Sequence, residues 1–302
     1  MPITKLEQMF EALKSKPKKR LVAAYANDAH TIGAVSNAVD MGIVDATLVG
    51  DETTIRNVCK QDNIDVNKFK IVQEADENKA SAKAVALINA GEGAILMKGL
   101  VSTDKYMRAI LNKENGLMES PNAILSHVTV IETPKYHKLL VVSDVAIIPL
   151  PDLKQKIAIT NYLIKTAHAL DIANPKVALL AATEQMSLGM VACTDAAIIS
   201  KMGDRGQIKG GIIDGPLALD VIVDKESCEI KKLKSPVAGD ADCILFPNIE
   251  SGNVFFKTNT KLCGGELAAV VFGAKVPCVL TSRGDSEKTK LYSIALAATL
   301  AK

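Results

Sequence analysis

One short segment near the end of the chain places a hydroxyl, a permanent cation and a carboxylate within four positions: Ser282, Arg283 and Asp285. An apolar run ending at Leu280 predicts a buried strand before this segment, and helical spacing resumes over Glu287–Leu300. In open α/β sheets, ligands bind outside the carboxyl ends of the strands, where the N–H groups of the next helix favour anions. The segment is therefore a candidate anion site. The alternative is that its serines only cap a helix and that Arg283 is a solvated charge.

The length and composition of the chain indicate a globular protein with more than one domain. Its 302 residues exceed the size at which a single core usually stops growing, and 48% of them are hydrophobic. The 36 basic and 34 acidic residues nearly balance, which argues against a nucleic-acid-coating protein. The first ten residues do not resemble a signal peptide, and the longest apolar run, 139–151, is too short to span a bilayer. We expect a cytoplasmic protein without a membrane segment.

The cysteines and histidines do not form a metal-binding pattern. Six cysteines are scattered without any C-x-x-C pair, and the four histidines are isolated from one another and from the cysteines. Free thiols in a reducing compartment are the expected state. Asp240 and Asp242 could in principle share a divalent ion with Asp214 or Asp220, although loop carboxylates are the simpler interpretation. The sequence therefore predicts no metal.

Apolar runs alternate with helical patterns along the chain, which is typical of βαβ units and a largely parallel sheet. The first series predicts strands at 21–26, 45–50, 69–73 and 93–97, and helices at 31–41, 51–62, 77–90 and 103–112. The second series predicts strands at 128–131, 138–142, 145–148, 176–181 and 243–246, and helices at 153–170, 195–201 and 264–272. Asp214, Gly215 and Pro216 are expected to form the turn that follows a further strand.

Several motifs, in this order, resemble the phosphate acetyl/butyryltransferase family nearly from end to end. The segments that carry the resemblance are Leu96–Thr103 with Arg108, Ser126–Val128, Asp214–Asp220, Val237–Asp242, Gly252–Asn253 with Lys257, and Thr281–Ser286. The resemblance implies transfer of an acyl group between coenzyme A and inorganic phosphate through a ternary complex, with no metal and no bound cofactor.

The resemblance also implies a fold. It predicts two α/β domains with mainly parallel sheets and a cleft between them, in a fold like that of the isocitrate and isopropylmalate dehydrogenases. The first domain is expected to comprise 1–126 plus 280–302, because the last strand and helix return to it, and the second to comprise 127–279. The resemblance implies a homodimer or a higher homo-oligomer with small molecules, acyl-CoA and phosphate, as its ligands. Neither nucleic acid nor a membrane is an expected partner, given the charge balance and the short apolar runs.

The chemistry of acyl transfer assigns roles to the residues of these motifs. Guanidinium groups match phosphate oxygens bidentately, which suits Arg283 and Arg108. Ser282 is expected to donate a hydrogen bond to the developing oxyanion; a covalent role has little support because no histidine is near it in the sequence. The other candidates for contact with phosphate or coenzyme A are Lys98, Thr103 and Asp214. For Lys98 and Arg108 the alternatives are an ordinary strand-end cation and a solvated helix charge.

The general base is the least determined residue of the site. In the acetyltransferase branch an acidic residue follows the serine by seven positions, and here that position is Thr289. An aspartate soon after the Ser-Arg pair is instead a feature of the butyryl branch, which assigns Asp285, with Glu287 as the alternative. A carboxylate near the thiol of coenzyme A would accept its proton. Butyryl is therefore the expected acyl group, although the sequence does not fix the chain length.

Three other functions remain open on the sequence. The first is transfer of acetyl instead of butyryl. The second is a metal- and nicotinamide-dependent decarboxylating dehydrogenase, whose fold resembles that of this family but which needs an aspartate cluster for its metal. The third is a non-catalytic sensor of coenzyme A or acyl phosphate, which would have no reason to keep Ser282, Arg283 and an adjacent acid.

Overall fold

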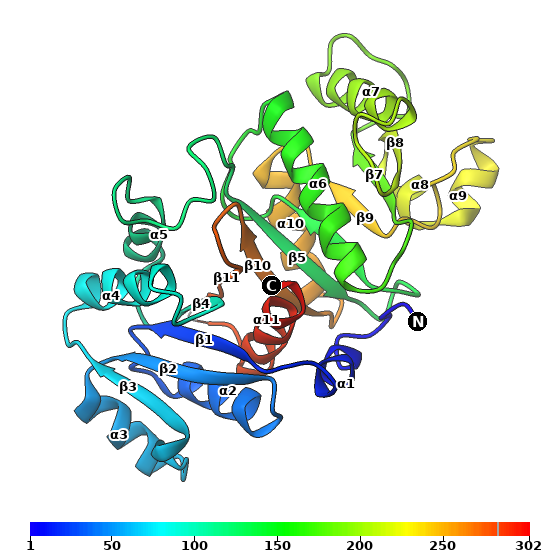
Figure 1. Ribbon diagram of the computed structural model, residues 1–302. Helices are drawn as coiled ribbons and strands as arrows, with labels where there is room; N and C mark the ends of the chain where they lie inside the picture. The colour runs from blue at the N-terminus through cyan, green and yellow to red at the C-terminus, as the bar shows by residue number, and fades with distance from the viewer. Residues whose placement is uncertain (283) are drawn as a thin grey trace. The chain divides into compact units, whose positions relative to one another are not determined.

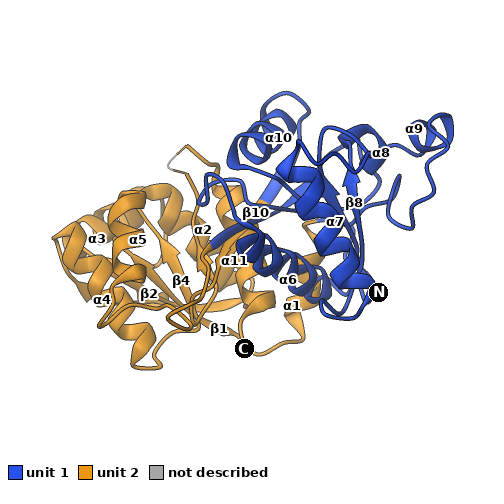
Figure 2. Cartoon of the chain, turned by 90° about the horizontal axis from the view of Figure 1, so that it is seen from above, with its two compact units in different colours: residues 1–5, 126–267 blue, residues 6–125, 268–302 orange. Residues whose placement is uncertain are grey.

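The chain folds into two compact units, which the computed structural model describes over residues 1–282 and 284–302. Unit 1 comprises residues 1–5 and 126–267, and unit 2 comprises residues 6–125 and 268–302 (Figure 2). Both units are built from strands that alternate with helices (Figure 1). The alternation of apolar runs and helical patterns in the sequence therefore predicts the fold class, a mixed α/β protein with mainly parallel strands.

Unit 2 contains a mainly parallel sheet. Its strands are β1 (Lys19–Ala24), β2 (Val44–Gly50), β3 (Phe69–Gln73), β4 (Ile95–Lys98), β11 (Cys278–Val279) and most of β10 (Glu266–Phe272). The first five of these strands lie side by side in the order β3-β2-β1-β4-β11 and are all parallel, while β10 pairs antiparallel with β11. Strand β4 and the last four residues of β1 are buried, which explains why they form continuous apolar runs in the sequence.

The helices of unit 2 pack on both faces of this sheet. They are α1 (Gln8–Lys14), α2 (Ala29–Asp40), α3 (Glu52–Gln61), α4 (Glu77–Asn89), α5 (Thr103–Leu111) and α11 (Glu287–Leu300), with a 3₁₀ turn at Val66–Lys68. Helix α11 packs against α2, and α4 packs against α5 and β1; Figure 1 shows α2 and α4 on opposite sides of the sheet. The connections from β1 and β4 thus lead directly into helices, which is the arrangement that positions a site at the strand ends.

Unit 1 contains a second series of strands and helices. Its strands are β5 (Ser126–Glu132), β6 (Leu140–Ser143), β7 (Lys176–Leu180), β8 (Ile212–Leu217) and β9 (Cys243–Leu245). Its helices are α6 (Leu153–Ala169), α7 (Val191–Asp204), α8 (Leu219–Val223), α9 (Lys225–Ile230) and α10 (Ile249–Lys261). The strand order is β5-β6-β9-β7-β8; only the β5–β6 pair is antiparallel among the pairs described in this unit.

One predicted strand and one predicted helix are wrong, and each error has a physical cause. Residues 145–148 do not form a strand, because the Oδ1 atom of Asp144 accepts the N–H groups of Ala146 at 2.7 Å and Ile147 at 2.9 Å and turns the chain. The segment 264–272 is largely strand β10 and not a helix. Every residue from Leu267 to Phe272 is buried, and periodicity alone cannot distinguish a fully buried strand from a buried helix.

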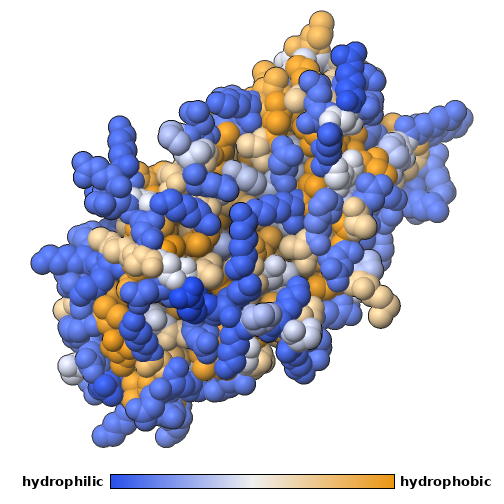
Figure 3. All heavy atoms as spheres, in the orientation of Figure 1, coloured by the Kyte–Doolittle hydropathy of each residue, from blue (hydrophilic) through white to orange (hydrophobic). Residues whose placement is uncertain are grey.

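The surface of unit 1 carries several exposed apolar side chains on α7 and the loop before it. These residues are Met186, Leu188, Val191 and Ile198. Figure 3 shows hydrophobic atoms gathered over this part of the unit, at the top of the view. Exposed apolar groups of this kind are typical of surfaces that contact other molecules. Within the described ranges, every helix falls short of the length and apolar content that crossing a membrane requires.

Candidate functional site

Three neighbouring strands of unit 2 end at nearly the same level of the sheet. Ala24 of β1 pairs with Lys98 of β4, and Val279 of β11 pairs with Met97 of β4. The chain first adds β2 and β3 on one side of β1 and then places β4 on its other side, so the direction of winding reverses between β1 and β4. Ligands of open α/β sheets bind outside the carboxyl ends of the strands at such a switch point.

The buried phenol of Tyr106 lies between two of these strands. Its Oη atom is 3.3 Å from the carbonyl oxygens of both Leu96 in β4 and Val279 in β11. Burial raises the pKa of Tyr106 well above its ordinary value, so the phenol stays neutral and able to donate a hydrogen bond. The ends of β4 and β11 are therefore held in a fixed relation.

Each of the three strands is followed by a loop and a helix whose first turn is capped by a side chain. Asp28 caps α2, Ser102 caps α5 and Ser286 caps α11, each accepting the N–H group three residues later, at 2.9, 3.4 and 3.1 Å. The remaining N–H groups of a first helical turn, together with the positive end of the helix dipole, favour an anion. Three such helix starts follow the same edge of the sheet.

Lys98 and Gly99 form a tight crossing over the end of β1. Lys98 is only 3% exposed, and its Nζ donates to the carbonyl of Gly99 at 3.2 Å. The N–H of Gly99 donates to the carbonyl of Ala24 at 3.0 Å, and a Cβ atom on Gly99 would lie 2.4 Å from the carbonyl oxygen of Tyr25. Only glycine permits this approach of two backbones. The crossing brings the buried ammonium of Lys98 to the switch point.

The turn after β11 is closed by its own polar groups. The N–H of Ser282 donates to Oδ2 of Asp285 at 2.7 Å, and the N–H of Asp285 donates back to the carbonyl of Ser282 at 3.2 Å. The N–H of Gly284 approaches Oγ of Ser282 at 3.4 Å. Arg283 lies outside the described residues. One oxygen of the proposed base thus has a structural contact within the turn, while the Ser282 hydroxyl is exposed and donates no hydrogen bond in the contacts of the described residues.

Glu287, the alternative base, is attached to a different element. Its Oε1 atom accepts a hydrogen bond from Nδ2 of Asn37 at 2.5 Å, and a Cβ atom on Gly33 would lie 2.8 Å from Oε2. Both of these contacts are with α2. The Glu287 carboxylate therefore joins the start of α11 to α2.

A buried lysine beneath the turn was not predicted as a site residue. Lys290 is 3% exposed, and its Nζ donates to the carbonyls of Ser282 at 3.0 Å and Asp285 at 3.2 Å. Burial lowers the pKa of Lys290 below its ordinary value, while the nearby carboxylates of Asp285 and Asp28 oppose that shift. Every residue of α11 from Lys290 to Ala298 is buried, so the helical part of the sequence has no periodic signal that would have singled out Lys290.

The two candidates on α5 lie at the helix surface. Thr103 is its first residue and is exposed, with Ser102 serving as the cap. Arg108 has a side chain that is 76% exposed, and its Nη2 lies 2.9 Å from Oδ2 of Asp104, one helical turn earlier. An exposed pair of this kind is the solvated arrangement that the sequence also allowed. Among the contacts of the described residues, none joins Arg108 to the Ser282 turn.

Asp214 belongs to unit 1 and lies within β8, not in a turn as the sequence predicted. It pairs in register with Ala178 of β7, and its Oδ1 atom accepts the N–H of Gly215 at 2.9 Å. The strand continues through Gly215 and Pro216 to Leu217. The prediction was wrong because Gly and Pro are strong turn signals in a sequence. Pro is nevertheless tolerated in a strand at the edge of a sheet, and β8 is the last strand in the order of this unit.

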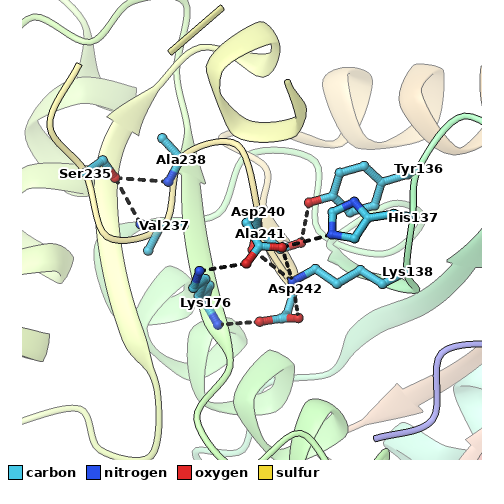
Figure 4. Close-up of polar contacts among 10 residues, drawn as sticks. All are labelled: Tyr136, His137, Lys138, Lys176, Ser235, Val237, Ala238, Asp240, Ala241 and Asp242. Atoms are coloured by element: carbon cyan, nitrogen blue, oxygen red, sulfur yellow. Dashed lines mark hydrogen bonds and ion pairs between the residues drawn. The ribbon is translucent and has the colours of Figure 1, made fainter. Parts of the chain in front are cut away.

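Asp240 and Asp242 bind lysines at the amino ends of three strands of unit 1 (Figure 4). Ligands of open α/β sheets bind at the opposite, carboxyl ends of the strands. Nζ of Lys138 lies 2.8 Å from Asp240 and 2.7 Å from Asp242, and Nζ of Lys176 lies 2.7 Å from Asp240. Burial alone would raise the pKa of Asp240, but hydrogen bonds from Lys138, Lys176 and His137 hold it well below its ordinary value. The two carboxylates are loop residues, as expected. Over residues 1–282 and 284–302, no three His, Cys, Asp or Glu side chains gather as metal ligands.

Comparison with known proteins identifies the family. The family model "Phosphate acetyl/butaryl transferase" matches residues 5–82 and 74–298. The chain belongs to this family. It is 45% identical over 299 residues to a phosphate butyryltransferase of Clostridium acetobutylicum, which covers 99% of both chains. It is 39% identical over 295 residues to a phosphate butyryltransferase of Clostridium beijerinckii, which covers 98% of this chain and 97% of the relative.

A solved structure supports the same relationship. The chain matches a branched-chain phosphotransacylase from Enterococcus faecalis with a TM-score of 0.81 and 28% identity, over 93% of this chain and 98% of the other. The motif-based resemblance to the transferase family is therefore confirmed.

Proposed function

We propose that the chain transfers a short acyl group, butyryl in the first place, between coenzyme A and inorganic phosphate, converting acyl-CoA and phosphate into acyl phosphate and coenzyme A. The observation that carries this proposal is the 45% identity, over 99% of both chains, to a phosphate butyryltransferase. The edge of unit 2 supports it, because three capped helix starts and a buried ammonium follow the strand ends where an anionic substrate would bind.

The proposed reaction requires phosphate and thioester to be bound together. A phosphate oxygen attacks the thioester carbonyl carbon, the tetrahedral intermediate collapses, the carbon–sulfur bond breaks, and the thiolate of coenzyme A takes a proton. Arg283 and Lys98 bind the phosphate charge, with Thr103, Arg108 and Asp214 as further substrate contacts. Ser282 donates its hydroxyl hydrogen to the oxyanion, where losing one donor typically costs about a hundred- to a thousandfold in rate.

In the reverse direction the thiol must first lose its proton. Asp285 is the proposed base, because it lies in the same turn as Ser282 and is hydrogen-bonded to it. A free thiol has a pKa of roughly 8.5, so a nearby carboxylate increases the reactive fraction near neutral pH. Comparing Asp285→Asn with Glu287→Gln in the direction that consumes coenzyme A distinguishes the two carboxylates.

The acyl-chain preference is tested with a panel of thioesters. Acetyl-, propionyl-, butyryl- and hexanoyl-CoA are each incubated with the chain and phosphate, and free thiol is measured with a thiol reagent. We expect the highest kcat/KM for butyryl-CoA. Each methylene added or removed should lower kcat/KM by no more than about 200-fold, and typically by about 10-fold or more. An acetyl-CoA optimum would support the acetyl branch. No release from any short acyl-CoA would contradict the transferase and leave the sensor function.

The same panel, repeated with EDTA, addresses the dehydrogenase alternative. A decarboxylating dehydrogenase needs a divalent metal, whereas the transferase does not, so we expect unchanged thiol release. Activity that disappears with EDTA and returns with a divalent ion would contradict the metal-free transferase.

A cytoplasmic location and a homodimer are also proposed from the family resemblance. Light scattering on the purified chain would measure the oligomeric state.

A further inference from the structure

The lysine beneath the Ser282 turn joins both ends of that turn to α11. Nζ of Lys290 donates to the carbonyl of Ser282 at 3.0 Å and to the carbonyl of Asp285 at 3.2 Å. In the sequence, Ser282 and Asp285 flank Arg283 and Gly284. A single ammonium group therefore fixes the spacing of the two turn residues to which catalysis is assigned.

Helix α11 does not need this lysine in order to begin. Its N-cap is Ser286, whose Oγ accepts the N–H of Thr289 at 3.1 Å. Side-chain caps of this kind satisfy the first turn of a helix. The two hydrogen bonds of Lys290 run backwards, to residues before the helix, so they stabilise the turn and not the helix start.

Placing an ammonium here has a cost, which indicates that its position matters. Lys290 is 3% exposed, and burial of a charged group is unfavourable unless opposite charges compensate it. The compensating charges come from two elements: Asp285 in the turn, and Asp28 in the loop after β1. Oδ2 of Asp28 is buried and accepts no hydrogen bond from the described residues. A leucine or methionine would fill this position without that cost.

We propose that Lys290 is a positioning residue, which holds Ser282 and Asp285 in their reactive geometry through the two backbone carbonyls. This inference rests on the proposed function of the turn. Lys290 acts through Ser282 and its neighbours and does not itself contact the reacting atoms. It adds to the site a residue that the Ser-Arg-Gly-Asp motif does not include.

The first test replaces Lys290 with methionine, which keeps an unbranched side chain of similar length but has no donor. A misplacement of about 1 Å can cost on the order of a hundredfold in rate, so we expect kcat for phosphate-dependent release of coenzyme A to fall about 10- to 100-fold, with the KM for butyryl-CoA little changed. Lys288→Met is the matched control, because Lys288 lies on the same helix and its side chain is 52% exposed. Unchanged kcat in Lys290→Met would overturn the proposal.

A double-mutant cycle with Ser282→Ala separates positioning from general destabilisation. If Lys290 acts through the turn, the double variant loses less activity than the product of the two single losses. Independent, multiplicative losses would mean that Lys290 is merely structural and would overturn this inference alone. Full activity in Ser282→Ala would overturn the site assignment and this inference with it. If circular dichroism shows that Lys290→Met is unfolded, the same cycle is run with Lys290→Gln, which stays polar but has a shorter, uncharged side chain, and the same coupling criterion applies.

Discussion

Replacement of Arg283 by alanine is expected to lower kcat/KM for butyryl-CoA in the presence of phosphate by at least about a hundredfold, the size of one lost transition-state contact. The dianionic phosphate must lie beside an acyl carbonyl on which negative charge develops. A guanidinium binds phosphate oxygens bidentately and remains charged even when it is partly desolvated. Steady-state kinetics at varied phosphate concentration measure the effect.

The matched control for this variant is Arg56→Ala. Arg56 lies on α3, is 53% exposed and pairs with Glu52 at 2.7 Å, and exposed pairs of this kind contribute little. We expect its kinetics to equal those of the unmodified chain. A decrease of less than about fivefold in Arg283→Ala, equivalent to about 1 kcal/mol, would place Arg283 among ordinary surface charges.

Replacement of Ser282 by alanine is expected to lower kcat by about a hundred- to a thousandfold, because it removes one donor to the oxyanion. Among residues 1–282 and 284–302, the described contact of the Ser282 Oγ is as acceptor of the N–H of Gly284 at 3.4 Å, and a hydroxyl that accepts can still donate its hydrogen to the substrate. The loss in kcat should be similar for butyryl-CoA and for acyl-CoA esters with a slightly shorter or longer chain. The Ser282 hydroxyl is proposed to bind the carbonyl oxygen, which all these substrates share, and not the acyl chain.

Ser286 provides the control for this variant within the same segment. Ser286→Ala removes the cap of α11 and should reduce the free energy of unfolding by about 1 kcal/mol, while the activity per folded molecule is retained. Retained activity in Ser282→Ala, or an equal loss in both variants, would mean that these serines only cap the helix. That is the alternative which the sequence alone left open.

The fold was predictable where local patterns and tertiary structure agree. Strands such as β2 (Val44–Gly50) and helices such as α4 (Glu77–Asn89) were predicted to within a few residues. Each is an apolar or periodic segment bounded by a turn signal or a capping side chain, as Asp76 is for α4. The regular alternation of these segments then predicts a mainly parallel α/β arrangement.

The errors occur where one residue or tertiary burial overrides the pattern. The apolar residues after Asp144 satisfy a strand pattern, yet the carboxylate of Asp144 binds two following N–H groups and forms a turn. Strand β10 has no alternation because all of its residues after Glu266 are buried, and such a run reads equally well as a helix. The cleft between two domains and the comparison with dehydrogenases stay predictions.

The sequence supplied the residue types of the candidate site, but it did not predict the hydrogen bonds that these residues form with one another. The sequence places Lys98 and the Ser282 turn each at the end of a strand, but it does not predict that these two strands, β4 and β11, are neighbours in the sheet. The contacts of Asp285, whose carboxylate binds the Ser282 N–H, and of Lys290 depend on how the turn closes on α11. Such contacts join backbone atoms whose positions no spacing rule specifies.

The central claim is that phosphate is the acyl acceptor, and the most direct test follows both products in one reaction. The purified chain is incubated with butyryl-CoA at increasing phosphate concentration, free thiol is measured with a thiol reagent, and acyl phosphate is measured by phosphorus NMR. The account predicts no thiol release without phosphate, saturation with phosphate, and one butyryl phosphate formed for each coenzyme A released. Thiol release that does not depend on phosphate, or that yields no butyryl phosphate, would contradict it.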